Sequence, residues 1–377
     1  MTGGSVPLGD VLLEGVALLR RLLPADWTLR TVPEAAAQPR AAGRRFDALL
    51  EVQDPQGTYA RLLVEAKEGL SPRDVDSQLV DQVRLLRRLD RGFLAVVFAR
   101  WLSPRTRTIL EAEGIGYLDL TGNISMVLPR PAVVLRTEGA RHDPAPAPRA
   151  ADVSVRGTRA SRVVRLLADV QPPYTASMVA READVSVPYA SRLLTMLDRE
   201  ALVTRDRRGS VVDVAWQDLL RRRAETYSIF SANRVSGYLA GTGAREATAA
   251  VRDGRLPYLA VTGSFAAAQL APVAAPAQLV CYVAAPVVPD PALGWLPTEH
   301  GSDVVLLEPY DPVVVKRLVI RDGLCVVAPS QLVLDTLSGN GRLPAEGEAL
   351  LVWMAEHEGE WRAPAIGVLP PQQAAIA

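Results

Sequence analysis

Leu62-Leu63-Val64-Glu65-Ala66-Lys67 is the stretch that decides the fold of the first third of this chain. An apolar run that turns into alternating polar and apolar residues indicates a β-strand. Residues i and i+2 of a strand point to the same face, so Glu65 and Lys67 project together. The chain has 42 Lys and Arg residues, and Lys67 and Lys316 are its only lysines. A lysine beside a carboxylate at a strand end is therefore the first candidate site.

A second strand is expected just upstream, over residues 45–52, with Asp47 at its start. Asp54-Pro55-Gln56-Gly57 supplies turn residues that would fold the two strands into a hairpin. The start of the first strand then lies beside the end of the second, which places Asp47 next to Glu65. Two neighbouring carboxylates can hold a hard cation such as Mg²⁺, and an ammonium beside them can stabilise negative charge.

Helices are expected on either side of this hairpin. Residues 8–23 form an apolar-rich helix that Pro24 ends, and its Glu14 is a further candidate carboxylate. Ser71-Pro72 begins a second helix, in which apolar residues recur at helical spacing and Gln78 and Gln82 lie one turn apart. A buried strand over 93–98 and a helix over 104–113, closed by Gly114, follow.

The order helix, hairpin with Asp47 and Glu65-x-Lys67, helix, strand resembles the PD-(D/E)XK restriction-endonuclease-like fold. The resemblance implies an α/β nuclease-like domain over residues 1–140, with catalytic positions at Asp47, Glu65, Lys67 and Gln78 and with Mg²⁺ on Asp47 and Glu65. The family's tyrosine four residues after Gln78 is absent, because Gln82 stands there. The alternative is a Glu and a Lys on a solvated strand face, a common pattern without catalytic meaning.

Composition indicates a globular protein of two or three domains, with 377 residues, 49% hydrophobic and 22% charged. Two cysteines and three histidines are too few for a disulfide framework or a zinc site. The run over residues 256–289 contains no charged residue. It also contains five prolines, which exclude a membrane-spanning helix there. No secretion signal opens the chain, so we expect a cytoplasmic protein without membrane association.

The charge is zero overall and uneven along the chain. Residues 141–225 carry 15 arginines against 11 acidic residues, or +4, whereas residues 226–377 carry 9 basic against 14 acidic residues, or −5. A Pro/Ala linker over residues 141–152 separates the basic segment from the first domain. The basic segment is therefore the natural candidate for contact with nucleic acid.

Residues 153–225 show the pattern of a helix-turn-helix. Helices are expected over 159–168 and 175–183, then a turn over 184–186 and a third helix over 187–197. Two short strands would pair around Asp206-Arg207-Arg208-Gly209-Ser210 and form a wing. This order resembles winged-helix transcription regulators, with Ala201 where many of them have glycine.

Such a helix enters the major groove of duplex DNA with its N-terminal residues, and the wing lies along the backbone. Ser186 is expected to cap the recognition helix and Tyr189, Ser191 and Arg192 to face DNA. Arg207 and Arg208 are expected on phosphates or in the minor groove. The alternative is a winged helix used for protein contacts.

Residues 226–377 contain a strand that ends in Gly263-Ser264 before a helix, which resembles the opening of nucleotidyltransferase folds. Those enzymes need a carboxylate pair on the following strand to hold metal. The candidate strand over residues 278–283 has none, so this α/β domain is expected to be a degenerate, inactive relative. The alternative is a plain strand-turn-helix without nucleotide binding.

The winged helix, the degenerate Gly-Ser domain and the ending over 328–335 with Gly341-Arg342 together resemble AbiEi-type bacterial antitoxins and regulators. The stretch over 117–123 is also similar to actinobacterial-type relatives, and its Gly122-Asn123 suits a hairpin turn. The resemblance implies operon repression through the winged helix and a toxin or other protein as partner of the C-terminal domain. In that group the winged helix usually comes first, whereas here a nuclease-like domain precedes it.

The sequence therefore predicts a cytoplasmic transcriptional regulator that binds double-stranded DNA. A Mg²⁺-dependent endonuclease of repair or phage defence, targeted by its winged helix, is the second hypothesis. A non-catalytic scaffold for DNA or protein is the third. A homodimer is among the assembly states that the sequence leaves open.

Overall fold

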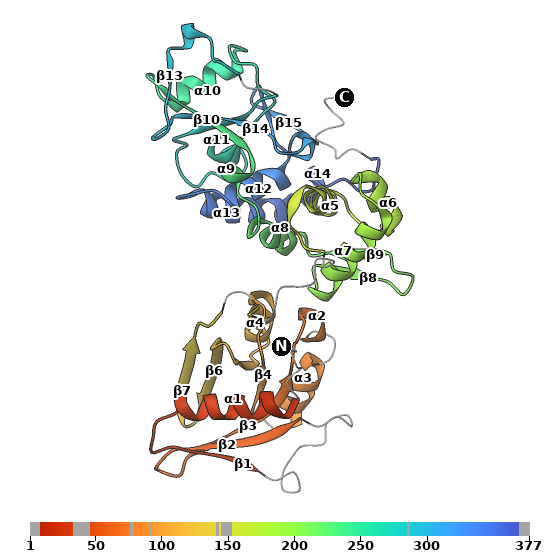
Figure 1. Ribbon diagram of the computed structural model, residues 1–377, viewed down its shortest axis with the longest axis vertical. Helices are drawn as coiled ribbons and strands as arrows, with labels where there is room; N and C mark the ends of the chain where they lie inside the picture. The colour runs from red at the N-terminus through yellow and green to blue at the C-terminus, as the bar shows by residue number, and fades with distance from the viewer. Residues whose placement is uncertain are drawn as a thin grey trace, which may run out of the picture. The chain divides into compact units, whose positions relative to one another are not determined.

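The computed structural model describes residues 8–32, 46–75, 79–89, 92–140, 143–144, 153–284 and 287–368. The chain divides into two compact units (Figure 1). Unit 1 comprises residues 1–152 with 199–201, and unit 2 comprises residues 153–198 with 202–377. Each unit contains a seven-stranded mixed sheet with helices, which confirms the α/β class. The boundary expected at 225/226 falls inside unit 2.

Unit 1 is built on a sheet whose strands lie in the same order as in the sequence, from β1 to β7. The pairs β3–β4 and β4–β5 are parallel and the other neighbours are antiparallel. The strands are β1 Thr28–Val32, β2 Ala48–Gln53, β3 Tyr59–Lys67, β4 Phe93–Ala99, β5 Gly116–Asp119, β6 Ile124–Pro129 and β7 Ala132–Thr137.

The hairpin of β2 and β3 lies where the sequence predicts it. Ala48 pairs with Val64 and Gln53 with Tyr59. In the turn, the Asp54 carboxylate accepts hydrogen bonds from the amides of Gln56 and Thr58, at 3.0 and 2.8 Å. Gly57 has φ +85°, a left-handed conformation that glycine adopts without steric cost. These local interactions fix the register and thereby the face that each side chain of β3 reaches.

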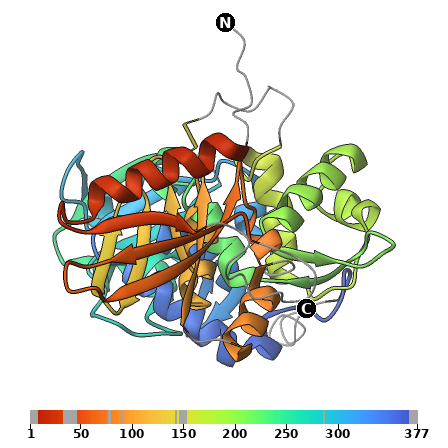
Figure 2. The ribbon, with the colours of Figure 1, turned by 90° about the horizontal axis from the view of Figure 1, so that it is seen from below.

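Helices cover both faces of this sheet, in three layers. Helix α1 (Leu8–Leu22) packs on one face, over Leu62, Val64 and their neighbours, as Figure 2 shows in red. The other face carries Leu63 and Val97 and is covered by α2 (Pro72–Asp74), α3 (Val80–Leu89) and α4 (Pro104–Ala112). Each large apolar side chain removed from water in this way stabilises the fold by about 1.5 to 3 kcal/mol.

Unit 2 opens with three helices and a two-stranded hairpin. The helices are α5 (Gly157–Asp169), α6 (Ala176–Glu182) and α7 (Val187–Arg199). Strands β8 (Val203–Arg205) and β9 (Val211–Val214) form the hairpin, and α8 (Trp216–Ala224) follows. The loop between β8 and β9 extends away from the three helices (Figure 1).

The second sheet of unit 2 has the strand order β13-β10-β14-β12-β11-β16-β15. Its strands are β10 Arg234–Ala240, β11 Ala260–Thr262, β12 Leu279–Tyr282, β13 Trp295–Pro297, β14 Val304–Glu308, β15 Val319–Arg321 and β16 Leu324–Val326. The helical segments around it are α9 Ile229–Ala232, α10 Ala244–Arg252, α11 Gly263–Ala267, η2 Pro291–Leu293, η3 Pro312–Val315, α12 Pro329–Leu337, α13 Leu343–Glu356 and α14 Glu358–Trp361.

The three-helix region and this sheet share one hydrophobic core. A single cluster of buried apolar residues runs from α5 to the second sheet and to α13. Trp216 of α8 meets Trp361 of α14 edge to face, with ring centres 5.0 Å apart. Arg165 of α5 is fully buried, and its guanidinium donates to Val313 O at 3.1 Å and to Gln331 Oε1 at 2.6 Å. The helices of residues 153–225 are therefore an integral part of unit 2.

Candidate nucleic-acid interface and metal site

The turn between α6 and α7 sets the start of the helix that the sequence predicts as the DNA-reading element. Asp184 has φ +51°, so the chain reverses tightly there. The Ser186 hydroxyl accepts a hydrogen bond from Tyr189 N at 3.4 Å, which is the geometry of the expected N-cap. Ser186 and Arg192 are exposed, whereas Ser191 is half-buried.

Tyr189 has a second role that the sequence did not reveal. Its ring is half-buried against the hydrophobic core, and the Arg159 guanidinium lies 5.9 Å from the ring centre. Burial raises the pKa of the Tyr189 hydroxyl, so this group stays a neutral donor and acceptor at physiological pH. Tyr189 thus supports α7 as well as reaching its surface.

The hairpin loop is ordered by one aspartate. Asp206 Oδ1 accepts hydrogen bonds from the amides of Arg208 and Ser210, both at 2.9 Å. Gly209 has φ +85°, the conformation that this tight loop requires. Arg207 and Arg208 are exposed at the tip. Two adjacent cations are therefore presented on a rigid loop.

Arg205 ties the hairpin to α7, a function that sequence reasoning missed. Its Nε donates to Gly209 O at 2.9 Å and its Nη1 to Thr195 Oγ1 at 3.0 Å. The only sequence signal was an arginine among apolar and β-branched strand residues. The contact fixes the angle between the loop and the helix.

Positive charge dominates the exposed surface of this region. Between residues 153 and 214 of unit 2, six arginines are exposed, namely Arg156, Arg159, Arg181, Arg192, Arg207 and Arg208. Asp184, Asp206 and Asp213 are the exposed acidic residues over the same range. Asp184 is paired with Arg162, and Asp206 is engaged by backbone amides. The net field of this surface therefore attracts polyanions.

In unit 1 the structure brings three of the predicted catalytic residues together. The Asp47 carboxylate accepts a hydrogen bond from Ala66 N at 2.7 Å, and the register of β2 with β3 puts Asp47 opposite Glu65. The Lys67 ammonium lies 2.7 Å from Glu65 Oε1. Glu65 is 5% exposed, whereas Asp47, which directly precedes β2, is exposed. Asp47 and the Glu65–Lys67 ion pair thus lie together where β2 begins and β3 ends.

The remaining candidates of unit 1 are distributed differently. Gln78 lies outside the described residues. Gln82, on α3, is 9% exposed, and its Nε2 has no hydrogen-bond partner among the residues that the structure describes. Glu14 is exposed on α1, which covers the sheet face opposite to that of α3. The interpretation of Glu14 as a further carboxylate of the site is therefore wrong.

Asp47 and Glu65 suit a hard cation that keeps most of its water. Within the described ranges, three or more His, Cys, Asp or Glu side chains nowhere gather around a possible metal position. Mg²⁺ is commonly held by one or two carboxylates plus waters and substrate phosphates, and this donor set fits that pattern. Such an ion would compete with Lys67 for Glu65, because the ion pair occupies one carboxylate oxygen.

The Gly263-Ser264 corner of unit 2 points its hydroxyl inward. Ser264 Oγ donates to Glu346 Oε2 at 2.7 Å, and both residues are buried. Glu346 forms a further ion pair with Arg342, at 3.3 Å. Strand β12, Leu279–Tyr282, carries no carboxylate. The hydroxyl that the resemblance would place on a phosphate is therefore engaged within the protein.

Beside this corner lies a fully buried carboxylate, Asp335. It accepts four hydrogen bonds, at 2.7 to 3.0 Å, from Tyr227, Thr262, Tyr282 and Gln331. Burial raises the pKa of Asp335 to about 6, and the four hydrogen bonds oppose that shift. Gln331 also accepts from Arg165, so the network reaches α5.

Across the described parts of the chain, no helix is both long and apolar enough to cross a membrane. The described residues of the run over 256–289 instead include β11, α11 and β12. Comparison of the chain with family models, with curated proteins and with solved structures gave no match.

Proposed function

We propose that this chain is a cytoplasmic transcriptional regulator that binds double-stranded DNA through residues 153–225. The three helices and the hairpin have the element order of a winged helix-turn-helix. The observation that carries the proposal is the pairing of a capped, arginine-bearing α7 with a rigid loop that exposes Arg207 and Arg208. One element reaches base edges and the other reaches phosphates.

The proposal extends to the antitoxin type of regulator. In it, residues 226–377 bind a toxin or another protein rather than a nucleotide. The support is the inward orientation of Ser264 and the absence of carboxylates from β12. Incorporation of labelled nucleotide into RNA or protein by the purified chain, abolished by Ser264→Ala, would contradict this part of the proposal.

The test of DNA binding uses the full chain, because α5 and α8 share their core with the second sheet. A ligand is first selected from a random duplex library, and its affinity is then measured by fluorescence anisotropy between low and high salt. The variant R207A/R208A should weaken binding to every duplex and reduce the salt slope by about 2, since each lost phosphate contact removes about one unit. R192A should instead relax the sequence preference, by about 1 to 3 kcal/mol at one base position.

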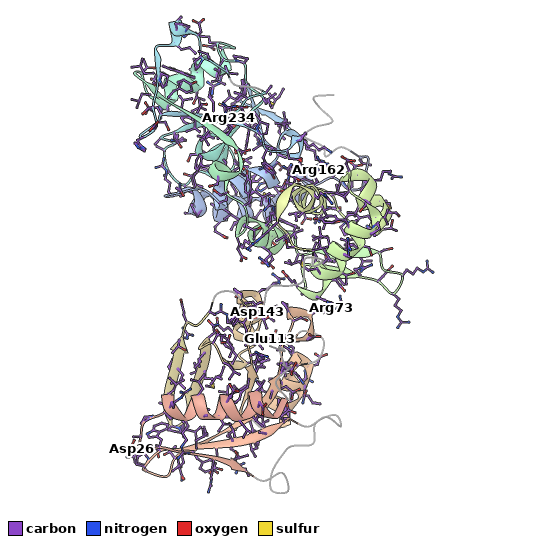
Figure 3. The ribbon with its side chains drawn as sticks, viewed as in Figure 1. Asp26, Arg73, Glu113, Asp143, Arg162 and Arg234 are labelled. Carbon is purple, nitrogen blue, oxygen red and sulfur yellow. The ribbon has the colours of Figure 1, made fainter. Side chains whose placement is uncertain are left out.

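A matched control removes the same charge elsewhere in unit 2. Arg234 of β10, labelled in Figure 3, and Arg245 of α10 are both exposed. R234A/R245A should leave the affinity and the salt slope close to those of the wild type. Equal loss in R234A/R245A and in R207A/R208A would mean that only net charge matters, and it would overturn the interface.

A second candidate function is favoured by the geometry of Asp47, Glu65 and Lys67. With Mg²⁺ on the two carboxylates, the site would supply a metal-activated water and, from Lys67, a cation that stabilises charge on the scissile phosphate. Nicking of supercoiled plasmid in Mg²⁺ or Mn²⁺, lost in D47N and in K67A, would establish a nuclease. An absence of nicking would remove this candidate and leave the regulator proposal intact.

A further inference from the structure

Arg162 of α5 joins two carboxylates from distant parts of unit 2. Its Nη1 lies 2.8 Å from Asp184 Oδ2, in the turn that precedes α7. Its Nε donates to both oxygens of Asp311, at 3.1 and 3.2 Å, and its Nη2 lies 3.0 Å from Asp311 Oδ2. Arg162 is labelled in Figure 3. The three nitrogens of one guanidinium are thus committed to two acceptors.

The two acceptors differ in how firmly they are held. Asp311 is 5% exposed, and its Oδ1 also accepts a hydrogen bond from Val313 N at 2.9 Å, which fixes it at the start of η3. Asp184 has an 89% exposed side chain and a left-handed backbone. Arg162 therefore links the firmly held Asp311 to an exposed turn, which backbone hydrogen bonds from Asp184 N to Arg181 O at 3.4 Å and from Val185 N to Ala180 O at 2.9 Å also support.

The turn at Asp184 decides how α7 is presented. Ser186, two residues later, provides the N-cap of α7, and Arg192 lies in the next turns of the same helix. A small rotation at Asp184 would shift both residues and disturb the bond from Arg205 to Thr195, which sets the hairpin against α7. Base recognition needs both elements in register, whereas phosphate attraction tolerates such a shift.

We propose that Arg162 is a positioning residue for DNA recognition, which holds the α6–α7 turn to Asp311 and thereby makes sequence-specific binding depend on residues 226–377. This inference rests on the proposed function. Arg162 itself is not a phosphate contact, because its side chain is 27% exposed and its guanidinium is engaged by Asp184 and Asp311.

The direction of the change in DNA binding distinguishes a positioning role of Arg162 from a simple effect of charge. Asp311→Asn keeps an acceptor for Val313 N but turns an amide donor toward Arg162. Asp184→Asn removes an exposed negative charge beside the proposed DNA surface. Simple electrostatics predicts tighter binding for both variants. Positioning predicts a loss of about tenfold or more in the ratio of specific to non-specific affinity, equivalent to about 1.4 kcal/mol, with an unchanged salt slope.

The experiment compares D184N, D311N and R162K with the wild-type full chain, on the selected duplex and on a scrambled one. R162K keeps the charge but lacks the planar fork that serves two carboxylates, so it should lose specificity too. Glu348→Gln is the control, since Glu348 pairs with Arg221 at 2.7 Å and links α8 to α13 in the same unit. It should leave the specificity ratio unchanged.

The outcomes are distinguishable. The inference is supported if the wild type prefers the selected duplex, if D184N, D311N and R162K each lower the ratio of specific to non-specific affinity, and if E348Q does not. Unchanged or increased ratios in D184N and D311N overturn it and leave DNA binding standing. A wild-type chain that binds no duplex overturns both proposals. If D311N melts early in a thermal scan, D184N and R162K decide the matter, because their sites are more exposed.

Discussion

Each unit has a motif at a strand end that resembles a catalytic one, and the two motifs are treated in opposite ways. In unit 1, Glu65 and Lys67 end β3 as an ion pair beside the exposed Asp47. In unit 2, Thr262 and Ser264 flank the end of β11 and donate to the buried carboxylates Asp335 and Glu346. In unit 1, Lys67 and Asp47 lie at strand ends, where Asp47 is exposed. In unit 2, the hydroxyls of Thr262 and Ser264 are hydrogen-bonded to carboxylates inside the protein.

The difference teaches that the exposure of a carboxylate limits what such a motif can do, since Asp47 is exposed whereas Asp335 and Glu346 are buried. A carboxylate needs access to water and to a substrate before it can hold Mg²⁺ for catalysis. Asp335 instead accepts from three hydroxyls and one amide in the interior. Its carboxylate is thus a structural acceptor.

The largest effect is expected for Asp335→Ala. The change leaves buried donors of Tyr227, Thr262, Tyr282 and Gln331 without their acceptor and opens a cavity, at a total cost of about 4 kcal/mol. Urea denaturation followed in unit 2 measures the loss. Asp47→Ala in unit 1 is the comparison, because Asp47 is exposed, and an equal loss there would break the contrast between a buried and an exposed carboxylate.

The pH dependence of stability is the next largest effect. Burial raises the folded-state pKa of Asp335 to about 6, above its ordinary value of 3.8. Protonation therefore favours the folded state, and the stability contribution is full below the unfolded pKa and is lost as pH rises through about 6. We expect the stability of wild type relative to Asp335→Asn to fall by between about 2 and 3 kcal/mol from pH 4 to pH 7. A difference that does not vary with pH would contradict an ionisable Asp335.

Local and long-range features of the two motifs differed in how far the sequence could predict them. The hairpin, the placement of Asp47 opposite Glu65 and the Ser186 cap depend on residues close in sequence or joined by one turn, so they were accessible. The contact of Ser264 with Glu346 spans 82 positions, and that of Thr262 with Asp335 spans 73. Neither partner carries a local signal, because each only becomes a neighbour when the sheet and α12 and α13 pack together.

The shared core of unit 2 was missed for the same reason. The sequence places a boundary at 225/226, since charge and pattern change there. Apolar residues of α5 and α8 look like the inner face of a small three-helix domain, and nothing local shows that the same residues also contact α12. The bond of Arg165 to Gln331 of α12 and the packing of Trp216 on Trp361 of α14 reveal the shared core in the folded structure.

Helix α1 lies close to the sheet of unit 1 at Gly15, which faces Phe98 of β4. A Cβ on Gly15 of α1 would lie 2.4 Å from the ring of Phe98, which is fully buried on β4. Gly15→Ala should therefore destabilise unit 1 by about 2 kcal/mol through overpacking. Gly359→Ala is the control, because a Cβ there has open space, and alanine should be neutral or slightly stabilising. Equal melting of both variants would show that α1 adjusts freely.

The smallest effect is expected for the Glu65–Lys67 ion pair at the end of β3. Lys67→Met removes the cation beside the buried Glu65 and should cost about 1 kcal/mol, because water reaches the lysine end of the pair. The double variant Glu65→Gln with Lys67→Met should recover most of that loss. A double-mutant cycle in urea measures the coupling, and a loss as large as that of Asp335→Ala would make the ion pair a structural element like the unit 2 network.

The common core of unit 2 has a consequence for the transmission of binding energy. Helix α7 and strand β12 belong to one hydrophobic cluster, so we expect them to open together rather than as separate foldons. A duplex held by α7 at a hundred times its dissociation constant would stabilise the whole cluster by about 2.7 kcal/mol. Amide protons of β12 would then exchange with solvent more slowly, although DNA never touches that strand.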